Sequence, residues 1–376
     1  MNNNNILESR EMLHQMVKDF SLKEIKPFDE YIDKNKEVPK KLFNKIIDTG
    51  FLGLILPIEH GGAAFDPLSE ANTIYDIASV NASVAFTLEG HYKTVNQLMK
   101  YGKKSLQDKY LKQANKRIFA FGSTEPSGGS NVLGINGTAK KQGDYWILNG
   151  NKSMITNGGL AEVYLVLLKT SENELSCFLV DKDMEGFKYG KSEDFFGMRG
   201  TPVGEIFLEN VKVTDEYLLG NIGDGILIGD NAHYDARINM GAIAAGILNN
   251  TLNIVLKYSS ERKAKGKPIN ELYSIQDKLT EIAIALENTK NLYKEAANLK
   301  ISNKDYKKVA TMAKSYGSRA AFKSADHAIQ ALGGYGYSKE YPVERLLRDA
   351  RALQIAEGSL EKMVIEISSF LIKERE

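Results

Sequence analysis

The stretch Asp144-Tyr-Trp-Ile-Leu-Asn149-Gly150-Asn-Lys-Ser-Met-Ile-Thr156 interrupts a chain that is otherwise patterned for helices. It places an Asn-Gly pair between two runs of β-prone residues, which is the strongest short hairpin signal that a sequence offers. Similar short runs follow at 163–168, 176–180 and 205–208. The interval 118–222 is therefore predicted to form a small antiparallel β-barrel or sandwich.

Helical patterning lies on both sides of this interval. On the N-terminal side, an apolar stripe over 42–47 follows Pro39 and stops at Gly50, and Asp66-Pro67 is typical of a helix start. On the C-terminal side, long amphipathic stretches cover 230–262, 273–300, 305–332 and 360–373. The sequence predicts a mainly α fold with a central β unit: an N-terminal helical domain (1–117), the β-barrel (118–222) and a C-terminal four-helix bundle (223–376).

The composition excludes several classes of protein. The chain of 376 residues carries 49 Lys and Arg against 48 Asp and Glu, and this near balance argues against a nucleic-acid binder. No run of about 18 apolar residues occurs, so no membrane span is expected. Cys177 is the only cysteine, which rules out an internal disulfide framework and favours a cytoplasmic location.

Common catalytic motifs are missing or incomplete. The five histidines lie far apart in the sequence and form no HExxH pair, and no metal site is expected. Residues 186–192 are one residue too short for a phosphate-binding P-loop. The glycines at 223–229 match a dinucleotide fingerprint only loosely, and no βαβ pattern surrounds them.

Five Gly-rich or polar strings remain, close to the junctions between the three regions. They are FGSTEPSGGSN at 121–131, ITNGG at 155–159, QALGGYGY at 330–337, ERLLRD at 344–349 and IAEGS at 355–359. Consecutive glycines allow backbone N–H groups to approach a phosphate or a planar ring closely. Taken alone, the string at 121–131 is as typical of a surface loop as of a ligand-binding loop. Glu357 taken alone is more typical of a turn or cap than of a catalytic group.

Taken together, the strings resemble the acyl-CoA dehydrogenase family over essentially the whole chain. The family patterns and their positions are TEPxxGS at 124–130, ITNGG at 155–159, RxxxGxP at 262–268, QxxGGxGY at 330–337, PxERxxRDA at 342–350 and EG[TS] at 357–359. Their order and spacing also match the family. The family's architecture of helices, β-barrel and helices agrees with the order read from the hydrophobic pattern.

The resemblance implies FAD-dependent oxidation of the Cα–Cβ bond of an acyl thioester to a trans-2-enoyl thioester, in fatty acid metabolism. It implies that Glu357 removes the α-proton, helped by its own backbone N–H and a ribityl hydroxyl of FAD. In some relatives the base instead precedes the position of Arg237, where this chain has Ala236. The acyl pocket is expected near residues 89–92, where a bulky or polar lining would favour short or functionalised acyl groups.

The resemblance also assigns binding residues. The cofactor-binding positions are Phe121, Ser123, Thr124, Ser130, Met154, Thr156, Arg262 (from a neighbouring subunit), Gln330, Gly333, Gly334, Ser359 and Glu361. The substrate-binding positions are Ser130, Arg237 and Gly358. Departures from the family pattern are Asn131, Met154, Lys265, Tyr273, Ser359 and Glu361, and they put the FAD affinity and the electron partner in question.

The implied partners are an acyl-CoA substrate, an electron-transfer flavoprotein as acceptor, and further copies of the chain in a homodimer or homotetramer. Three alternatives stay open from the sequence. The acyl group could be attached to a carrier protein in a biosynthetic pathway, the enzyme could use oxygen, or the chain could be a non-catalytic helical protein that has lost FAD. The carboxylate at Glu357 argues against the oxygen-using alternative, since such relatives generally lack it.

Overall fold

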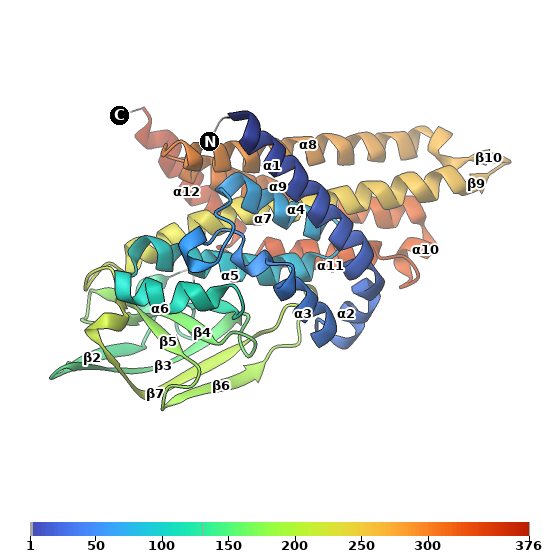
Figure 1. The fold of residues 1–376 in the computed structure, drawn as a ribbon. Coiled ribbons are helices and arrows are strands. Elements are labelled where there is room, and N and C mark those ends of the chain that lie inside the picture. Colours follow the sequence, from blue (N-terminus) through green and yellow to red (C-terminus); the bar gives the residue numbers. More distant parts are fainter. Residues whose placement is uncertain (1–2, 130, 376) are drawn as a thin grey trace.

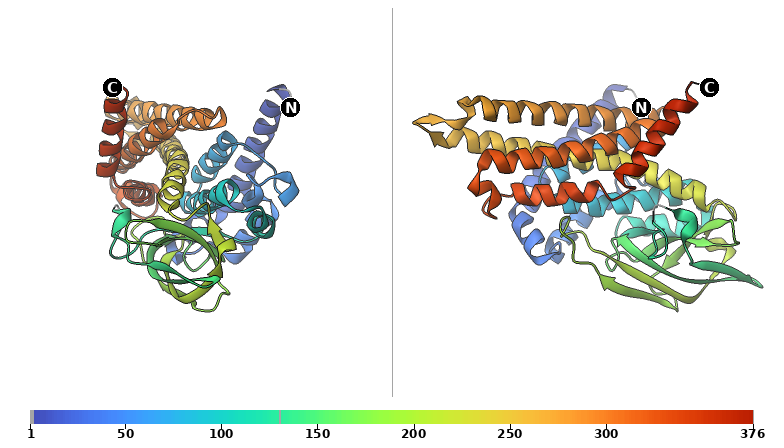
Figure 2. Two further views of the ribbon diagram at one scale, coloured as in Figure 1. Left: turned by 90° about the vertical axis from the view of Figure 1, so that its left-hand side faces the viewer. Right: turned by 180° about the vertical axis from the view of Figure 1, so that it is seen from behind.

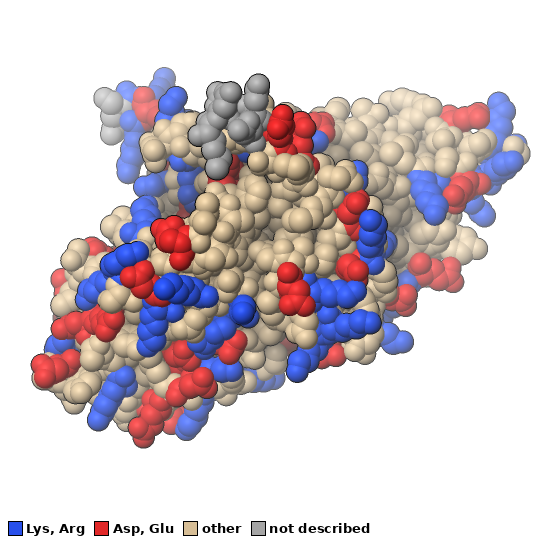
Figure 3. Space-filling model, in the orientation of Figure 1, with Lys and Arg blue, Asp and Glu red and all other residues tan. Residues whose placement is uncertain are grey.

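The computed structural model describes residues 3–129 and 131–375, and it describes side chains from residue 6 onward. Helices form both ends of the chain, and a curved β sheet lies between them in sequence and below them in Figure 1. The predicted fold class, mainly α with a central β unit, is confirmed. Acidic and basic side chains are interspersed over the sheet on the face drawn in Figure 3, in line with the near-neutral composition.

The described N-terminal region contains six α-helices, and the local signals predicted for two of them, α3 and α4, are confirmed. The helices are α1 (Asn3–Phe20), α2 (Asp29–Asn35), α3 (Lys40–Asp48), α4 (Pro67–Ala78), α5 (Ala82–Tyr101) and α6 (Lys104–Ala114). The Asp66 side chain accepts a hydrogen bond from the Ser69 N–H at 2.9 Å and caps α4. The stripe after Pro39 forms α3, and Gly50 follows it with φ +83°.

Helix α5 is buried on all sides along most of its length, because it packs against α4, α7 and β1. It nevertheless carries three ionisable residues in the middle, Glu89, His91 and Lys93, and each residue as a whole is at most 5% exposed. A helix that is buried all round is normally apolar, so these three residues need partners inside the protein.

His91 joins three elements through both ring nitrogens. Nε2 donates to the Leu52 carbonyl at 3.1 Å, and Nδ1 accepts from the Phe119 N–H at 3.2 Å. Protonation of Nδ1 would break the second bond, and burial lowers the pKa of His91 to about 4. His91 is therefore a buried residue that holds α5 to its neighbours.

We expect His91 to make the protein sensitive to acid. The unfolded chain takes up a proton near pH 6.5 while the folded chain resists it down to about pH 4. The free energy of unfolding should therefore fall through this window as the pH drops, by roughly 3 kcal/mol from this residue. Denaturant titrations across pH should show a shallower acid slope for His91→Gln than for the wild type. Parallel pH curves for the two proteins would contradict the assignment.

The sheet is mostly antiparallel. Its strands are β1 (Phe119–Gly122), β2 (Thr138–Gln142), β3 (Tyr145–Thr156), β4 (Val163–Lys169), β5 (Leu175–Asp181), β6 (Phe187–Ser192), β7 (Val203–Thr214) and β8 (Leu218–Leu219). The spatial order is β6-β7-β3-β2-β4-β5-β8, and β1 pairs with β4 in parallel. The left view of Figure 2 shows the strands curving round in a barrel-like layer.

The hairpin predicted at Asn149-Gly150 is wrong. Residues 145–156 form one continuous strand, β3, with a register shift against β7 at Leu148/Gly150. Asn149 stays in the sheet because its side chain exchanges hydrogen bonds with Asn210 on β7, at 2.9 and 3.2 Å. The Asn-Gly pair thus marks a β-bulge, which bends the strand without reversing it. The actual turn lies earlier, between Gln142 and Tyr145.

The C-terminal region consists of long helices and an extended arm. The helices are α7 (Gly225–Glu261), α8 (Tyr273–Ile301), α9 (Lys307–Leu332), α10 (Gly334–Tyr337), α11 (Val343–Leu353) and α12 (Leu360–Lys373). Helices α7, α8 and α9 pack on one another, and α11 and α12 pack against α9. A short hairpin of β9 (Lys263–Ala264) and β10 (Lys267–Pro268) forms the tip of the arm at the right of Figure 1.

Helix α7 is long and apolar enough to cross a bilayer by length and composition. However, 78% of its most apolar stretch of 18 residues is buried against the rest of the chain, so α7 packs as a core helix. Its 37 residues connect the region above the sheet with the arm.

Candidate active site

The ends of β1 and β3 meet α5 and α7 just above the sheet. The Phe121 ring, near the end of β1, lies 6.4 Å from the His233 ring on α7. Thr156, the last residue of β3, packs against Gly90 of α5, where a Cβ atom would come within 3.0 Å of the Thr156 methyl group. Two predicted cofactor residues, Phe121 and Thr156, are therefore placed at one junction.

Glu357 reaches the same junction from the loop between α11 and α12. Its carboxylate is 7% exposed, with Lys93 Nζ 2.5 Å from Oε1 and His233 Nδ1 2.7 Å from Oε2. The Lys93 ammonium also lies 5.9 Å from the centre of the Phe121 ring. The structure thus brings the predicted base together with the residues predicted to line the flavin.

The backbone at Glu357 is held in an uncommon conformation. Glu357 has φ +56° and Gly358 has φ +99°, in the left-handed region that disfavours residues with a Cβ. Arg237 Nε donates to the Glu357 carbonyl at 3.3 Å, and Lys314 Nζ donates to the Gly358 carbonyl. Residues with a Cβ rarely adopt φ +99°, so the turn favours glycine at position 358.

Burial and charge oppose each other at this carboxylate. Burial raises the pKa of Glu357, but the Lys93 ammonium and His233 outweigh it and hold the pKa well below its ordinary value. Burial raises the pKa of Glu89, one turn before Lys93, to about 8 even though Lys93 acts in the opposite direction. The Lys93 amine stays charged, because Glu357 and Glu89 raise its pKa against the effect of burial.

Arg237, a predicted substrate-binding residue, is 2% exposed and contacts the loop that carries the base. Its guanidinium pairs with both Glu366 oxygens at 2.5 and 3.1 Å, donates to Thr311 at 3.0 Å and lies over the Tyr234 ring. This arrangement connects α7, α9 and α12 around the Glu357 turn.

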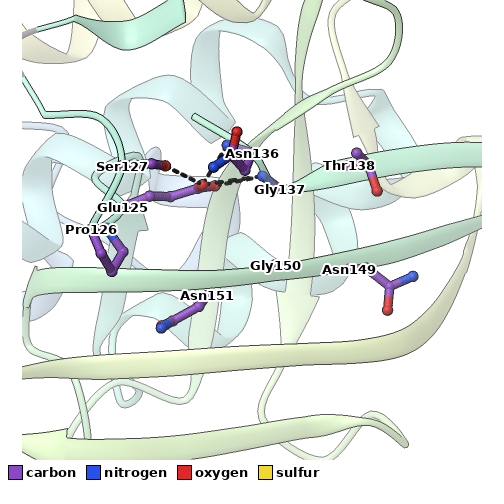
Figure 4. A pocket seen from close by; sticks show the side chains of 9 residues that line it. All are labelled: Glu125, Pro126, Ser127, Asn136, Gly137, Thr138, Asn149, Gly150 and Asn151. Carbon is purple, nitrogen blue, oxygen red and sulfur yellow. Dashed lines mark hydrogen bonds between the residues drawn. The ribbon is translucent and has the colours of Figure 1, made fainter. Parts of the chain in front are cut away.

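The string at 121–131 is anchored by a buried ion pair. Glu125 Oε1 lies 2.5 Å from Lys152 Nζ, and the two side chains are 3% and 0% exposed. The Glu125 carboxylate also accepts the N–H groups of Asn136 and Gly137 at 2.6 and 3.0 Å. Figure 4 shows these bonds at the wall of a pocket of about 350 Å³ between this loop and β3.

The predicted cofactor residues of this loop lie next to that anchor. Ser123 and Thr124 are half-buried, and the Thr124 carbonyl accepts the Ser153 N–H at 2.9 Å. Ser130, predicted to contact both FAD and substrate, lies outside the described residues.

A planar aromatic cofactor fits the exposed groups on β3. Met154 is 53% exposed, on a strained backbone with φ +55° at a second register shift of β3. Asn157 is fully buried, and its Oδ1 has no hydrogen-bond partner in the described structure, while its Nδ2 donates to the Thr87 carbonyl. The outward-pointing Met154 side chain suits a sulfur-ring contact with an isoalloxazine ring, whereas the Asn157 oxygen is enclosed by protein.

A second group of predicted cofactor residues lies at the arm. Arg262, Gln330, Gly333 and Gly334 line one pocket of about 570 Å³, which includes Tyr258 and Tyr335. A Cβ at Gly333 or Gly334 would meet no atom within 4 Å, so the backbone there is open to a ligand. Arg262 follows α7 by one residue and lies 29 residues after His233, which corresponds to roughly 43 Å along the helix.

Ser359 and Glu361 begin α12. The Ser359 hydroxyl accepts the Lys362 N–H at 3.4 Å and acts as the N-cap, and Glu361 is exposed in the first turn. Gly358 precedes them in the Glu357 turn. The structure therefore places these three predicted contacts beside the base, with the cap of α12 fixing the direction of the chain.

The sequence analysis did not identify Lys93 and His233, the two side chains that contact the Glu357 carboxylate. A signal was present for each. Lys93 follows Glu89 by four residues in one predicted helix, and His233 precedes Arg237 by four residues in another, so each pair shares a helix face.

Models of three acyl-CoA dehydrogenase domains match the chain: the N-terminal domain over 8–116, the middle domain over 120–211 and the C-terminal domain over 223–372. An acyl-CoA dehydrogenase of Bacillus subtilis is 36% identical over 374 residues, covering 98% of this chain and 99% of its own length.

Solved structures agree with this match. The butyryl-CoA dehydrogenase of Megasphaera elsdenii superposes with a TM-score of 0.95 at 31% identity, with 99% of both chains covered. A chain from a study of the electron transferring flavoprotein of Acidaminococcus fermentans gives 0.94 at 34% identity, covering 97% of this chain and 98% of its own. The chain therefore belongs to the acyl-CoA dehydrogenase family of FAD-dependent oxidoreductases.

Proposed function

We propose that the protein oxidises the Cα–Cβ bond of an acyl-CoA thioester, with Glu357 as the base, and passes the electrons to an electron-transfer flavoprotein. The observation that carries the proposal is the buried Glu357 carboxylate at the junction with Phe121 and Thr156. The similar butyryl-CoA dehydrogenase supports a coenzyme A thioester.

The chain's own groups account for proton removal. A Glu357 oxygen accepts the α-proton, and the positive-φ turn at 357–358 fixes the direction of that oxygen. The Glu357 backbone N–H is the proposed donor to the thioester oxygen, where one such donor contributes about 2.7–4 kcal/mol. Bound FAD supplies the two-electron acceptor. Burial of the carboxylate excludes water and strengthens these interactions.

The proposal is tested with purified holoenzyme in anaerobic buffer. Straight, branched and aryl acyl-CoA thioesters are added in turn, and the flavin absorbance and the enoyl product are measured. We expect at least one thioester to bleach the flavin and yield its trans-2-enoyl product. Bleaching by acyl groups on a carrier protein alone would point to the biosynthetic alternative, and absence of bound flavin would contradict the proposal.

We also propose that each cofactor is held by two chains. Arg262 lies roughly 43 Å along α7 from His233, and Gly333 lines the same pocket as Arg262. Both residues are therefore too far from Glu357 of the same chain to contact the cofactor beside it. The exposed Tyr273 and Tyr337, at 80% and 86%, offer apolar area for a second copy next to this pocket. A homodimer, alone or paired into a homotetramer, is the assembly expected in the cytoplasm.

Arg262→Ala should weaken cofactor binding without unfolding the chain, because Arg262 is exposed at the arm. Loss of a charge-assisted hydrogen bond costs about 1.5–3 kcal/mol, which corresponds to roughly 10–150-fold in FAD affinity. Titration of the apoprotein with FAD measures this change. Lys278→Ala, at a half-buried position on α8, is the matched control, and equal affinity of the two variants would exclude the arm from the site.

A further inference from the structure

Lys93 and His233 contact the two oxygens of the proposed base. The Lys93 ammonium lies 2.5 Å from Glu357 Oε1, and His233 holds Oε2. A carboxylate whose two oxygens are both paired with nitrogen donors is a weaker base, because the cation beside it stabilises the ionised form. Because a general base works best when its pKa approaches the working pH, this arrangement describes a resting form of the site.

Lys93 cannot simply be released, because it lies inside the protein. Its side chain is 6% exposed, and a buried ammonium without a counterion is strongly destabilising. If substrate displaces Lys93 from Glu357, another anion has to receive it.

Glu89 is placed to be that anion. It lies four residues before Lys93 on α5, a spacing that brings Cβ atoms to about 5–6 Å on one helix face. Its side chain is fully buried, and neither carboxyl oxygen has a hydrogen-bond partner in the described structure. A buried carboxyl without partners is costly unless some state of the protein provides one.

Resting on the proposed function, we propose that Lys93 is a positioning residue that exchanges between Glu357 and Glu89. Substrate entry moves its ammonium to Glu89, and this movement frees the base only when an acyl group is present. The charges around the exchange come from four helices and the loop: Glu70 on α4, Glu89 and Lys93 on α5, His233 on α7, Lys314 on α9, and Glu357. Because burial raises the pKa of Glu89 to about 8, a proton held by its carboxyl is released to solvent as the Lys93 ammonium arrives.

A first experiment needs no substrate. Melting temperatures are measured for the wild-type holoenzyme, E89Q, E357Q and the E89Q/E357Q double variant. The same four proteins are then measured with K93M added to each. Each single variant leaves Lys93 one carboxylate, so each should melt close to the wild type. The double variant should lose several degrees more than the sum, and K93M should remove this excess. Additive shifts would overturn the exchange.

A second experiment uses the thioester that bleaches the flavin. E89Q should slow flavin reduction roughly tenfold or more, because Lys93 then stays on Glu357, and adding K93M should restore the rate. K93M alone should shift the acid limb of the rate profile to higher pH, because the carboxylate loses its paired cation. K100M, on an exposed turn of the same helix, is the control. Unchanged rates for E89Q would overturn the proposal.

The two experiments separate the possible failures. If no thioester reduces the flavin, the proposed function fails while the melting cycle still tests the exchange. If thioesters reduce it but the melting shifts are additive, the function stands and the exchange does not.

Discussion

Glu357→Gln should abolish measurable dehydrogenation while leaving a folded, yellow protein. Gln keeps an oxygen and an amide at the position that Lys93 and His233 contact, but it cannot accept the α-proton. Loss of a general base lowers the rate by about 10²–10⁴-fold. Single-turnover flavin reduction under anaerobic conditions measures this effect separately from product release.

The matched control for this variant is Glu172→Gln, a change of the same chemistry in an exposed turn of the sheet. Its rate should equal that of the wild type. If Glu357→Gln retains full turnover with its flavin bound, Glu357 is not the base, and the role would have to pass to another group at the junction.

Glu125→Gln should be the most destabilising conservative change in the β region. It leaves the Lys152 ammonium, which is 0% exposed, without its counterion. Breaking a buried pair in this way costs about 3–5 kcal/mol. The loop at 121–131 should also loosen, because the carboxylate holds the N–H groups of Asn136 and Gly137. Denaturant titration and FAD affinity measure the two effects.

An exposed ion pair in the same sheet serves as the comparison for the buried Glu125–Lys152 pair. Glu209 and Lys188 form a pair at 2.6 Å on β7 and β6, but their side chains are 57% and 61% exposed. Glu209→Gln should change the free energy of unfolding by about 1 kcal/mol at most. Adding Lys152→Met to Glu125→Gln should recover part of the loss. Equal effects of the Glu125 and Glu209 variants would show that Lys152 finds another partner or water.

Local patterns predicted the elements whose signals are short-range. The cap at Asp66, the stop at Gly50 and the long C-terminal helices depend on neighbouring residues, and each was confirmed. Asn149-Gly150 has an equally strong local signal, but Asn210 lies 61 residues away and keeps Asn149 in the sheet. A tertiary contact therefore overrides the turn preference.

The candidate site also contains one residue that a local sequence string predicted and one that only tertiary packing reveals. Glu357 could be predicted because it lies in a recognisable string, whereas Lys93 is 264 residues away from it in sequence. Helix α5 is buried on every side, so its pattern does not distinguish one face from another. Which of its polar residues meets the base follows only from the packing of α5 against α7 and β1.

The uninterrupted length of α7 limits which insertions this protein can tolerate within that helix. One inserted residue would rotate everything beyond it by about 100° and advance it by about 1.5 Å. The arm would then point in a different direction around the helix axis relative to His233 and Arg237, although the helix itself would remain intact. Insertions of about seven residues nearly restore that phase but displace the arm by about 10 Å. The number of residues in α7 therefore sets both the distance and the direction of the arm relative to the site.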